Sequence, residues 1–154
     1  MRRLLLVLLL LPLLCGAARV ERYEMCFDRS DVEAAARMML GEAGCCTDFD
    51  KAACLVTACN RADRYGGTVE SQIAAEGQYL GYSEDLPVLD EYAALAIDVL
   101  VRWSLARQGL DVPLELPGDY LWFSAAADGS CNVFRDTFEF GNETNYVRGD
   151  KNGH

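Results

Sequence analysis

Histidine is nearly absent from this chain, because the single one, His154, is the last of 154 residues. Hydrolases that activate a serine or cysteine nucleophile need a positioned histidine base, and zinc amidases and zincins need histidine ligands. The sequence also contains no Cys-x-x-Cys pair and no glycine-rich phosphate loop. We therefore expect neither a metal nor a cofactor, and an enzyme built from this chain must work mainly with carboxylates, amides and aromatic side chains.

Basic residues are scarce as well. The chain has 14 lysines and arginines against 24 acids, which gives a formal net charge of −10. Such a surface repels phosphate backbones, so nucleic acid is not an expected partner. Half of the residues are nonetheless apolar, and at this length the chain can bury one core. We expect a single ordered domain that acts as a monomer.

The longest apolar run is short and stands at the N-terminus. Residues 4–14 follow a basic opening, Met1-Arg2-Arg3, and precede small residues around Cys15, which is the pattern of a secretory signal peptide. We expect a leader over residues 1–18, a secreted or cell-envelope location, and membrane contact only through this leader. Lipoprotein cleavage before Cys15 and an uncleaved signal anchor are the alternatives.

Six cysteines remain after such cleavage: Cys26, Cys45, Cys46, Cys54, Cys59 and Cys131. An even number in an exported chain indicates up to three disulfides, chosen from about 15 pairings. Cys45 and Cys46 are adjacent, so we expect separate partners for them. The alternative is that some or all of the six are free, buried thiols.

Helical signals dominate the middle of the chain. Ser30 followed by Glu33 is a capping-box signal, which predicts a helix from Asp31 that stops within residues 41–44. The next helix runs to about residue 64, and three residues can cap it: Thr47, Asp48 and Asp50. Its apolar residues recur at helical spacing and predict a buried stripe: Ala52, Leu55, Val56 and Cys59.

The second half predicts two more helices and a small β-hairpin, so the fold class is α+β and mostly α. Thr68 caps a short helix over residues 69–75, and a long helix follows over residues 87–108 with Pro87 in its first turn. Its expected inward stripe is Leu89, Ala93, Ala96, Leu100 and Trp103. Residues 120–123 form a strand, and after the Asp128-Gly129 turn signal either 133–140 or 145–147 pairs back.

Glu42 is the candidate catalytic acid. It stands at the expected end of the first helix, with Gly41 and Gly44 on either side and apolar residues 38–40 before it. A carboxylic acid there loses solvent, and desolvation raises its pKa toward the range that general acid catalysis uses near neutral pH. The alternative from the local sequence is an ordinary solvated acid in a helix's last turn.

The loop over residues 78–83 carries two aromatic and two hydrogen-bonding side chains. This composition suits the lining of a sugar-binding cleft, with Gln78 and Tyr79 as the contacts. Carboxylates, amides and aromatics together are the groups that cleave glycosides. An ordinary surface loop is the alternative.

Three short motifs follow one another along the chain: Leu40-Gly41-Glu42-Ala43-Gly44, Asn60-Arg61 and Gly77-Gln78-Tyr79. Aromatic segments come later, at 121–123, 132–134 and 141–146. In order and spacing this set resembles the SleB-type cell wall hydrolases, the catalytic domain of spore-cortex-lytic enzymes, over residues 31–147. Two positions depart from the family: Cys46 stands where another acid is usual, and Asn142 or Asn145 stands where a histidine is often found.

The resemblance implies a lysozyme-like helical domain that cleaves peptidoglycan between N-acetylmuramic acid and N-acetylglucosamine. It implies Glu42 as the acid, and the expected sugar contacts are Gln78, Tyr79, Asn60, Tyr120 and Phe123. The alternatives are a non-catalytic module on the same fold, which binds cell-wall glycan or a partner, and a small disulfide-stapled structural protein.

No second catalytic carboxylate is evident in the sequence. Asp48 and Asp50 are nearest to Glu42 and are expected to cap the second helix. A lone acid can complete the reaction if the muramic acid 6-hydroxyl attacks its own C1, so a lytic transglycosylase product is predicted, rather than the product of a muramidase. Folding could still bring another acid to the site from the loop: Glu76, Glu84 or Asp85.

Overall fold

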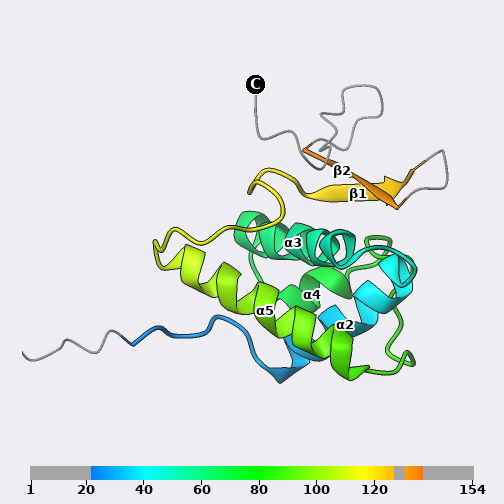
Figure 1. The fold of residues 1–154 in the computed structure, drawn as a ribbon, viewed down its shortest axis with the longest axis horizontal. Helices are drawn as coiled ribbons and strands as arrows, with labels where there is room; N and C mark the ends of the chain where they lie inside the picture. Colours follow the sequence, from blue (N-terminus) through cyan, green and yellow to red (C-terminus); the bar gives the residue numbers. More distant parts are fainter. Residues whose placement is uncertain (1–21, 127–130, 137–154) are drawn as a thin grey trace, which may run out of the picture.

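The computed structural model describes residues 22–126 and 131–136, which form an α+β domain (Figure 1). About half of these residues are helical, in α2 (Arg29–Ala43), α3 (Asp48–Tyr65), α4 (Val69–Ile73) and α5 (Asp90–Arg107). Strands β1 (Trp122–Ala125) and β2 (Asn132–Arg135) form a two-stranded antiparallel sheet. Within these ranges no helix has the length and apolar character needed to cross a bilayer.

Several predictions made from the sequence lie outside the described residues. They are the leader over residues 1–18, the Asp128-Gly129 turn, the alternative strand 145–147, and the positions of Asn142, Asn145 and His154.

The first helix begins at Arg29, before the predicted Asp31, because Asp28 caps it in place of Ser30. The Asp28 carboxylate accepts hydrogen bonds from the backbone N–H groups of Ser30 at 2.7 Å and Asp31 at 3.3 Å. The Asp31 carboxylate accepts the Asp28 N–H in return at 3.1 Å, which completes a capping box. Its other oxygen accepts the N–H of Glu70 on α4 at 2.8 Å. The capping box predicted at Ser30 and Glu33 is therefore wrong by two positions.

Thr47 is the cap of α3, since its side chain accepts the N–H of Asp50 at 3.3 Å. The Asp48 carboxylate instead pairs with Lys51 at 3.1 Å, and the Asp50 carboxylate accepts the Thr47 hydroxyl. The expectation that both acids cap this helix is therefore wrong. The predicted apolar stripe is confirmed, because all four of its members are buried: Ala52, Leu55, Val56 and Cys59.

Thr68 caps α4 as predicted, although that helix ends at Ile73. Helix α5 begins at Asp90, later than predicted, because Leu89 still has extended backbone as the N-cap and Pro87 precedes the helix. Its buried residues include Ala96, Leu100 and Trp103 of the predicted stripe. Tyr92 and Val99 are buried in place of the other two predicted members, Leu89 and Ala93, which are partly buried.

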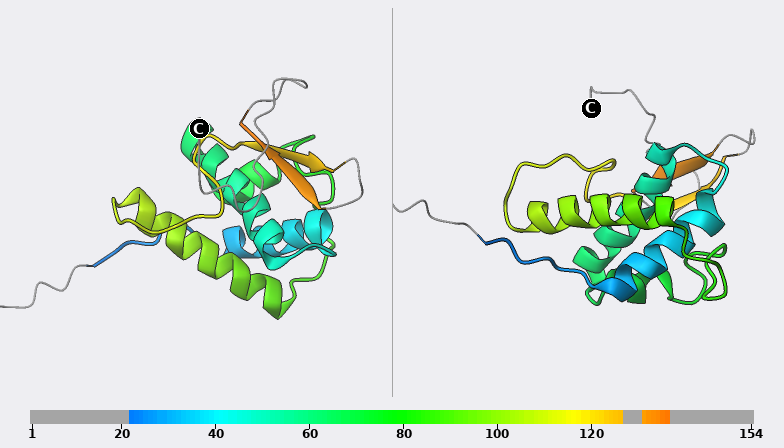
Figure 2. Two further views of the ribbon diagram at one scale, coloured as in Figure 1. Left: turned by 45° about the horizontal axis from the view of Figure 1, so that its top comes forward. Right: turned by 60° about the horizontal axis from the view of Figure 1, so that its bottom comes forward.

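Helix α2 packs against α3, α4 and α5, and the hairpin lies beside α3 on one side of the helices (Figures 1 and 2). Strand β1 begins at Trp122, not at residue 120, and Phe123 stands opposite Phe134. Phe134 is 2% exposed, so the hairpin closes the core from the α3 side.

A disulfide between Cys46 and Cys131, with Cα atoms 5.6 Å apart, ties the start of the β2 segment to the α2–α3 loop. The prediction of at least one disulfide is thus confirmed. The remaining cysteines of the described part are free, exposed at Cys26 and Cys45 and buried at Cys54 and Cys59. The expectation of a separate partner for Cys45 is therefore wrong, and free buried thiols account for two positions.

Candidate active site

Two glycines bring the end of α2 into contact with the loop that follows α4. A Cβ atom added to Gly41 would stand 1.9 Å from the carbonyl oxygen of Gly81. A Cβ on Gly81 would stand 2.5 Å from the carbonyl carbon and oxygen of Gly41. Only glycine at both positions permits this approach of the two backbones, since non-bonded carbon atoms normally stay about 3.5–4.0 Å apart.

The glycine contact fixes the position of Glu42. Its Oε1 atom accepts a hydrogen bond of 2.6 Å from the backbone N–H of Gly81. The side chain is partly exposed. Among residues 22–126 and 131–136 it forms no ion pair with any lysine or arginine. Glu42 is thus a carboxylate that one backbone donor orients, and no cation of the described residues is paired with it.

Helix α3 and the hairpin also reach the surroundings of Glu42. Burial raises the pKa of the Cys54 thiol, and the nearby negative charge of Glu42 raises it further. Asn132, at the start of β2, donates its side-chain N–H to the Cys54 sulfur at 3.4 Å. Three elements and one loop therefore converge near this acid.

Asp50, in the first turn of α3, is a second acid whose charge acts on Cys54. Its charge also raises the pKa of Cys54, so Asp50 and Glu42 act on the same thiol. Glu84, one of the loop acids considered from the sequence, instead lines a different hollow beside Arg37. Asp50 is therefore the first residue to test if the reaction needs a second carboxylate.

Three of the predicted sugar contacts line one small hollow of about 30 Å³: Gln78, Tyr79 and Phe123. Gln78 is exposed, whereas Tyr79 is only 7% exposed. The Tyr79 hydroxyl shares a hydrogen bond of 3.1 Å with the hydroxyl of Thr57, and its ring lies 5.7 Å from that of Phe123. The buried hydroxyl of Tyr79 is thus engaged with Thr57, and only a small part of the side chain is accessible to a ligand.

The other two predicted contacts lie beneath the surface. Asn60 is 3% exposed, and its amide nitrogen donates to the carbonyl oxygens of Pro117 at 2.8 Å and Tyr120 at 2.9 Å. Tyr120 is itself 7% exposed. The structure therefore places Asn60 as a residue that holds the linker before β1, and through it the hairpin wall of the hollow.

Sequence reasoning missed three residues that complete the hollow: Arg61, Leu121 and Trp122. Arg61 belongs to the Asn60-Arg61 motif and Trp122 to the predicted strand. The sequence therefore drew attention to both residues but did not indicate that they line a hollow. Glu42 does not line this hollow. The two are connected by the loop, because Gln78 and Tyr79 line the hollow and Gly81 binds Glu42.

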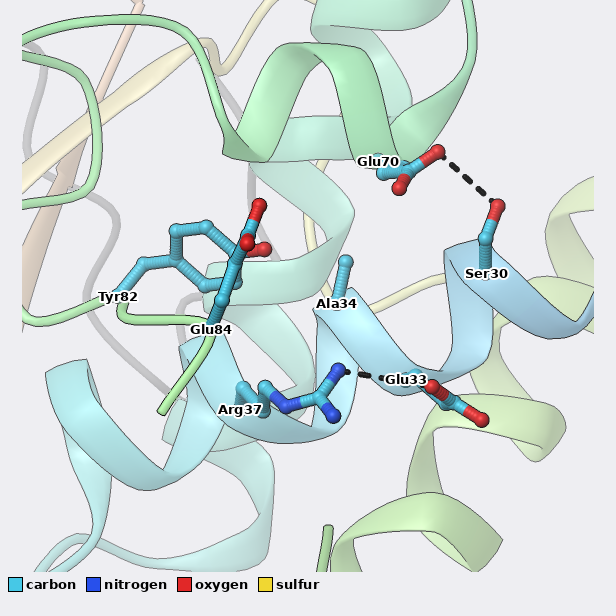
Figure 3. A pocket seen from close by; sticks show the side chains of 7 residues that line it. All are labelled: Ser30, Glu33, Ala34, Arg37, Glu70, Tyr82 and Glu84. Carbon is cyan, nitrogen blue, oxygen red and sulfur yellow. Dashed lines mark hydrogen bonds and ion pairs between the residues drawn. The ribbon is translucent and has the colours of Figure 1, made fainter. Parts of the chain in front are cut away.

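A wider hollow of about 330 Å³ lies against the first half of α2 (Figure 3). Its polar groups largely satisfy one another: Glu70 accepts the Ser30 hydroxyl at 3.0 Å, and Arg37 pairs with Glu33 at 3.6 Å. In the part of the chain that the structure describes, no group of three or more His, Cys, Asp or Glu side chains could hold a metal ion.

Fold and site together define an α+β domain in which a glycine contact holds the Glu42 carboxylate between a helix and a loop, without an ion-pair partner in the described ranges. Comparisons of the chain with protein-family models, with curated proteins and with solved structures find no match.

Proposed function

We propose that this chain is a peptidoglycan-cleaving glycosidase on a lysozyme-like fold, with Glu42 as its general acid and base. The setting of Glu42 carries the proposal. The carboxylate is partly buried, has no ion-pair partner in the described ranges, and is oriented by the N–H of Gly81. Among the described residues Glu42 is neither paired with a cation nor used as a helix cap, which leaves its carboxylate available for proton transfer.

The substrate follows from the ordered motifs that resemble SleB-type cell wall hydrolases. The bond cleaved joins N-acetylmuramic acid to N-acetylglucosamine, and the partner is the peptidoglycan glycan strand. The Cys46–Cys131 disulfide is compatible with the extracytoplasmic location that this substrate requires, and we place the protein in the secreted or cell-envelope class.

The chemistry needs one proton carried in both directions. The backbone N–H of Gly81 donates a hydrogen bond to Oε1 of Glu42. The other oxygen, Oε2, can therefore carry the proton. Glu42 gives this proton to the glycosidic oxygen as the bond to C1 of muramic acid breaks. The resulting carboxylate then takes the proton of the muramic acid 6-hydroxyl, whose oxygen bonds to C1. The product is a 1,6-anhydro sugar, no water is consumed, and Glu42 ends in its starting form.

The test is Glu42→Gln, which keeps the shape of the side chain and removes the transferable proton. Lysis of purified cell walls should fall about 10²–10⁴-fold, while the thermal unfolding transition is retained. Glu91→Gln is the matched control, since Glu91 is an exposed acid on α5 that lines neither of the two hollows described above. Unchanged lysis by the Glu42 variant refutes the assignment. A wild-type chain that binds peptidoglycan without cutting it supports the non-catalytic module instead.

Mass spectrometry of the digest decides the reaction outcome. We expect anhydromuropeptides. Fragments with ordinary reducing ends, one water heavier, would indicate hydrolysis and a second carboxylate. That residue would stand about 5–5.5 Å from Glu42 in a retaining enzyme and about 6.5–9.5 Å in an inverting one. Asp50→Asn would then be the variant to examine.

A further inference from the structure

Arg61 on α3 is a buried guanidinium that the proposed chemistry leaves unused. The residue is 8% exposed and lines the small hollow together with Gln78, Tyr79 and Trp122. Its Nε atom is buried and has no hydrogen-bond partner among the residues that the structure describes. A buried polar atom without a partner is uncommon in folded proteins, so the guanidinium of Arg61 has hydrogen-bonding capacity that the described residues leave unused.

No acid of the described ranges compensates the charge of Arg61. The other arginines on the helices pair with carboxylates in most cases: Arg29, Arg37, Arg102 and Arg107. Arg61 has only the ring of Tyr65, with the guanidinium carbon 5.4 Å from the ring centroid. Burial raises the pKa of its neighbour Tyr79, which therefore remains a neutral hydroxyl. A buried cation without an anion is costly, so the hollow favours an anionic ligand.

The size of the hollow limits what can enter it. One water needs about 10–15 Å³ of such space, and the hollow offers about 30 Å³. A group of two or three heavy atoms fits, whereas a whole sugar ring does not. A carboxylate has this size, and the guanidinium fork matches its two oxygens. The sugar that carries it would lie outside, against the aromatic wall formed by Trp122 and Phe123.

We propose that the Arg61 hollow binds a carboxylate carried by the peptidoglycan strand and so selects muramyl residues over plain N-acetylglucosamine. This inference rests on the proposed function, because Glu42 and the hollow are joined by the loop over residues 78–81. The carboxylate has two sources on a muramyl residue. One is the lactyl group of a strand freed of peptide, and the other is the stem peptide.

The test is a binding titration of the full chain carrying Glu42→Gln. The fluorescence of Trp122 reports binding. The other tryptophan, Trp103, is 2% exposed, so the signal reports the hollow. The probes are N-acetylmuramic acid, its methyl ester and N-acetylglucosamine. The free acid should bind at least about tenfold more tightly than the ester. Comparing denuded glycan with a muropeptide then shows which carboxylate is preferred.

Arg61→Met removes the charge at similar volume and should abolish the preference for the acid over the ester. Arg64→Met is the matched control on the same helix, because Arg64 is exposed, and it should keep the preference. Equal binding of acid and ester by the parent chain overturns the proposal, as does a preference that persists in Arg61→Met.

Thermal unfolding gives a second readout. If Arg61 has no anionic partner until a ligand binds, Arg61→Met should keep or raise the melting temperature, since the substitution leaves no buried partner unpaired. A marked fall overturns the proposal, because it means that Arg61 is already paired within the chain. The two proposals fail separately. Cleavage that survives Glu42→Gln removes the proposed function, whereas the preference for the acid over the ester depends on Arg61 alone.

Discussion

Gly81→Ala tests the contact that holds Glu42. The added Cβ would stand 2.5 Å from the carbonyl carbon of Gly41 and 3.0 Å from the backbone nitrogen of Glu42. Since such atoms need about 3.5 Å or more, the loop must move away from α2 by about 1 Å. The hydrogen bond from Gly81 to Glu42, now 2.6 Å, would lengthen to about 3.6 Å, beyond the range of N–H···O bonds.

Two effects add to the cost of this substitution. Overpacking costs about 1–3 kcal/mol, and losing a hydrogen bond to a charged group costs about 1.5–3 kcal/mol. We expect the free energy of unfolding to fall by about 2.5–6 kcal/mol, which is less than the stability of most domains of this size at 25 °C. A displacement of about 1 Å in a catalytic group can lower the rate about 10²-fold. The rate of cell-wall lysis by Gly81→Ala should therefore fall by a larger factor than the fraction of folded protein does.

The assay combines urea unfolding with cell-wall lysis, both measured on the same preparation. Gly118→Ala is the control, because a Cβ at Gly118 meets nothing within 4 Å. It should change the free energy of unfolding by less than about 0.5 kcal/mol and leave lysis unchanged. If Gly81→Ala matches this control in both measurements, the contact between Gly41 and Gly81 does not position Glu42.

Three further predictions concern the rest of the molecule. Reducing the Cys46–Cys131 disulfide, which closes a loop of 85 residues, should lower the free energy of unfolding by about 4.5 kcal/mol; a change under about 1 kcal/mol in denaturant titrations would contradict this. Alkylation of the folded protein at pH 8 should label the exposed thiols Cys26 and Cys45 and spare the two buried ones, whose raised pKa keeps them protonated; equal labelling of all four by mass spectrometry would count against it. Asn60→Ala should lower the free energy of unfolding by about 1–3 kcal/mol. Asn60→Asp should lower it more, because a carboxylate cannot donate to the two carbonyl groups. A higher melting temperature for Asn60→Asp than for Asn60→Ala would show that the amide donor is not needed.

The location of Glu42 at a helix end was predictable, but its partner was not. The glycines at 41 and 44 and the apolar residues before them indicated a helix end. That Gly81 would meet Gly41 depends on how α2 and the loop pack, across about forty residues of chain. No local pattern encodes such an approach, because a glycine in a loop is equally consistent with a simple turn.

The first helix shows why some boundaries were missed. Asp28 and Ser30 are both good caps, and local propensity does not choose between them. The choice falls to Asp28 because Asp31 completes the capping box and at the same time binds the N–H of Glu70 on α4. A tertiary contact thus decided a local feature.

The sequence by itself determined the elements whose signals are local. Thr47 and Thr68 cap α3 and α4 because a hydroxyl reaches an N–H a few residues later, and the α3 stripe is buried because its apolar residues share one helix face. Only the tertiary structure decided which cysteine pairs with Cys46, and that Arg61 lines a hollow where no acid of the described residues pairs with it. The physical reason is that pairing and burial depend on distances between residues far apart in the chain, and these distances exist only once the helices and the hairpin have packed.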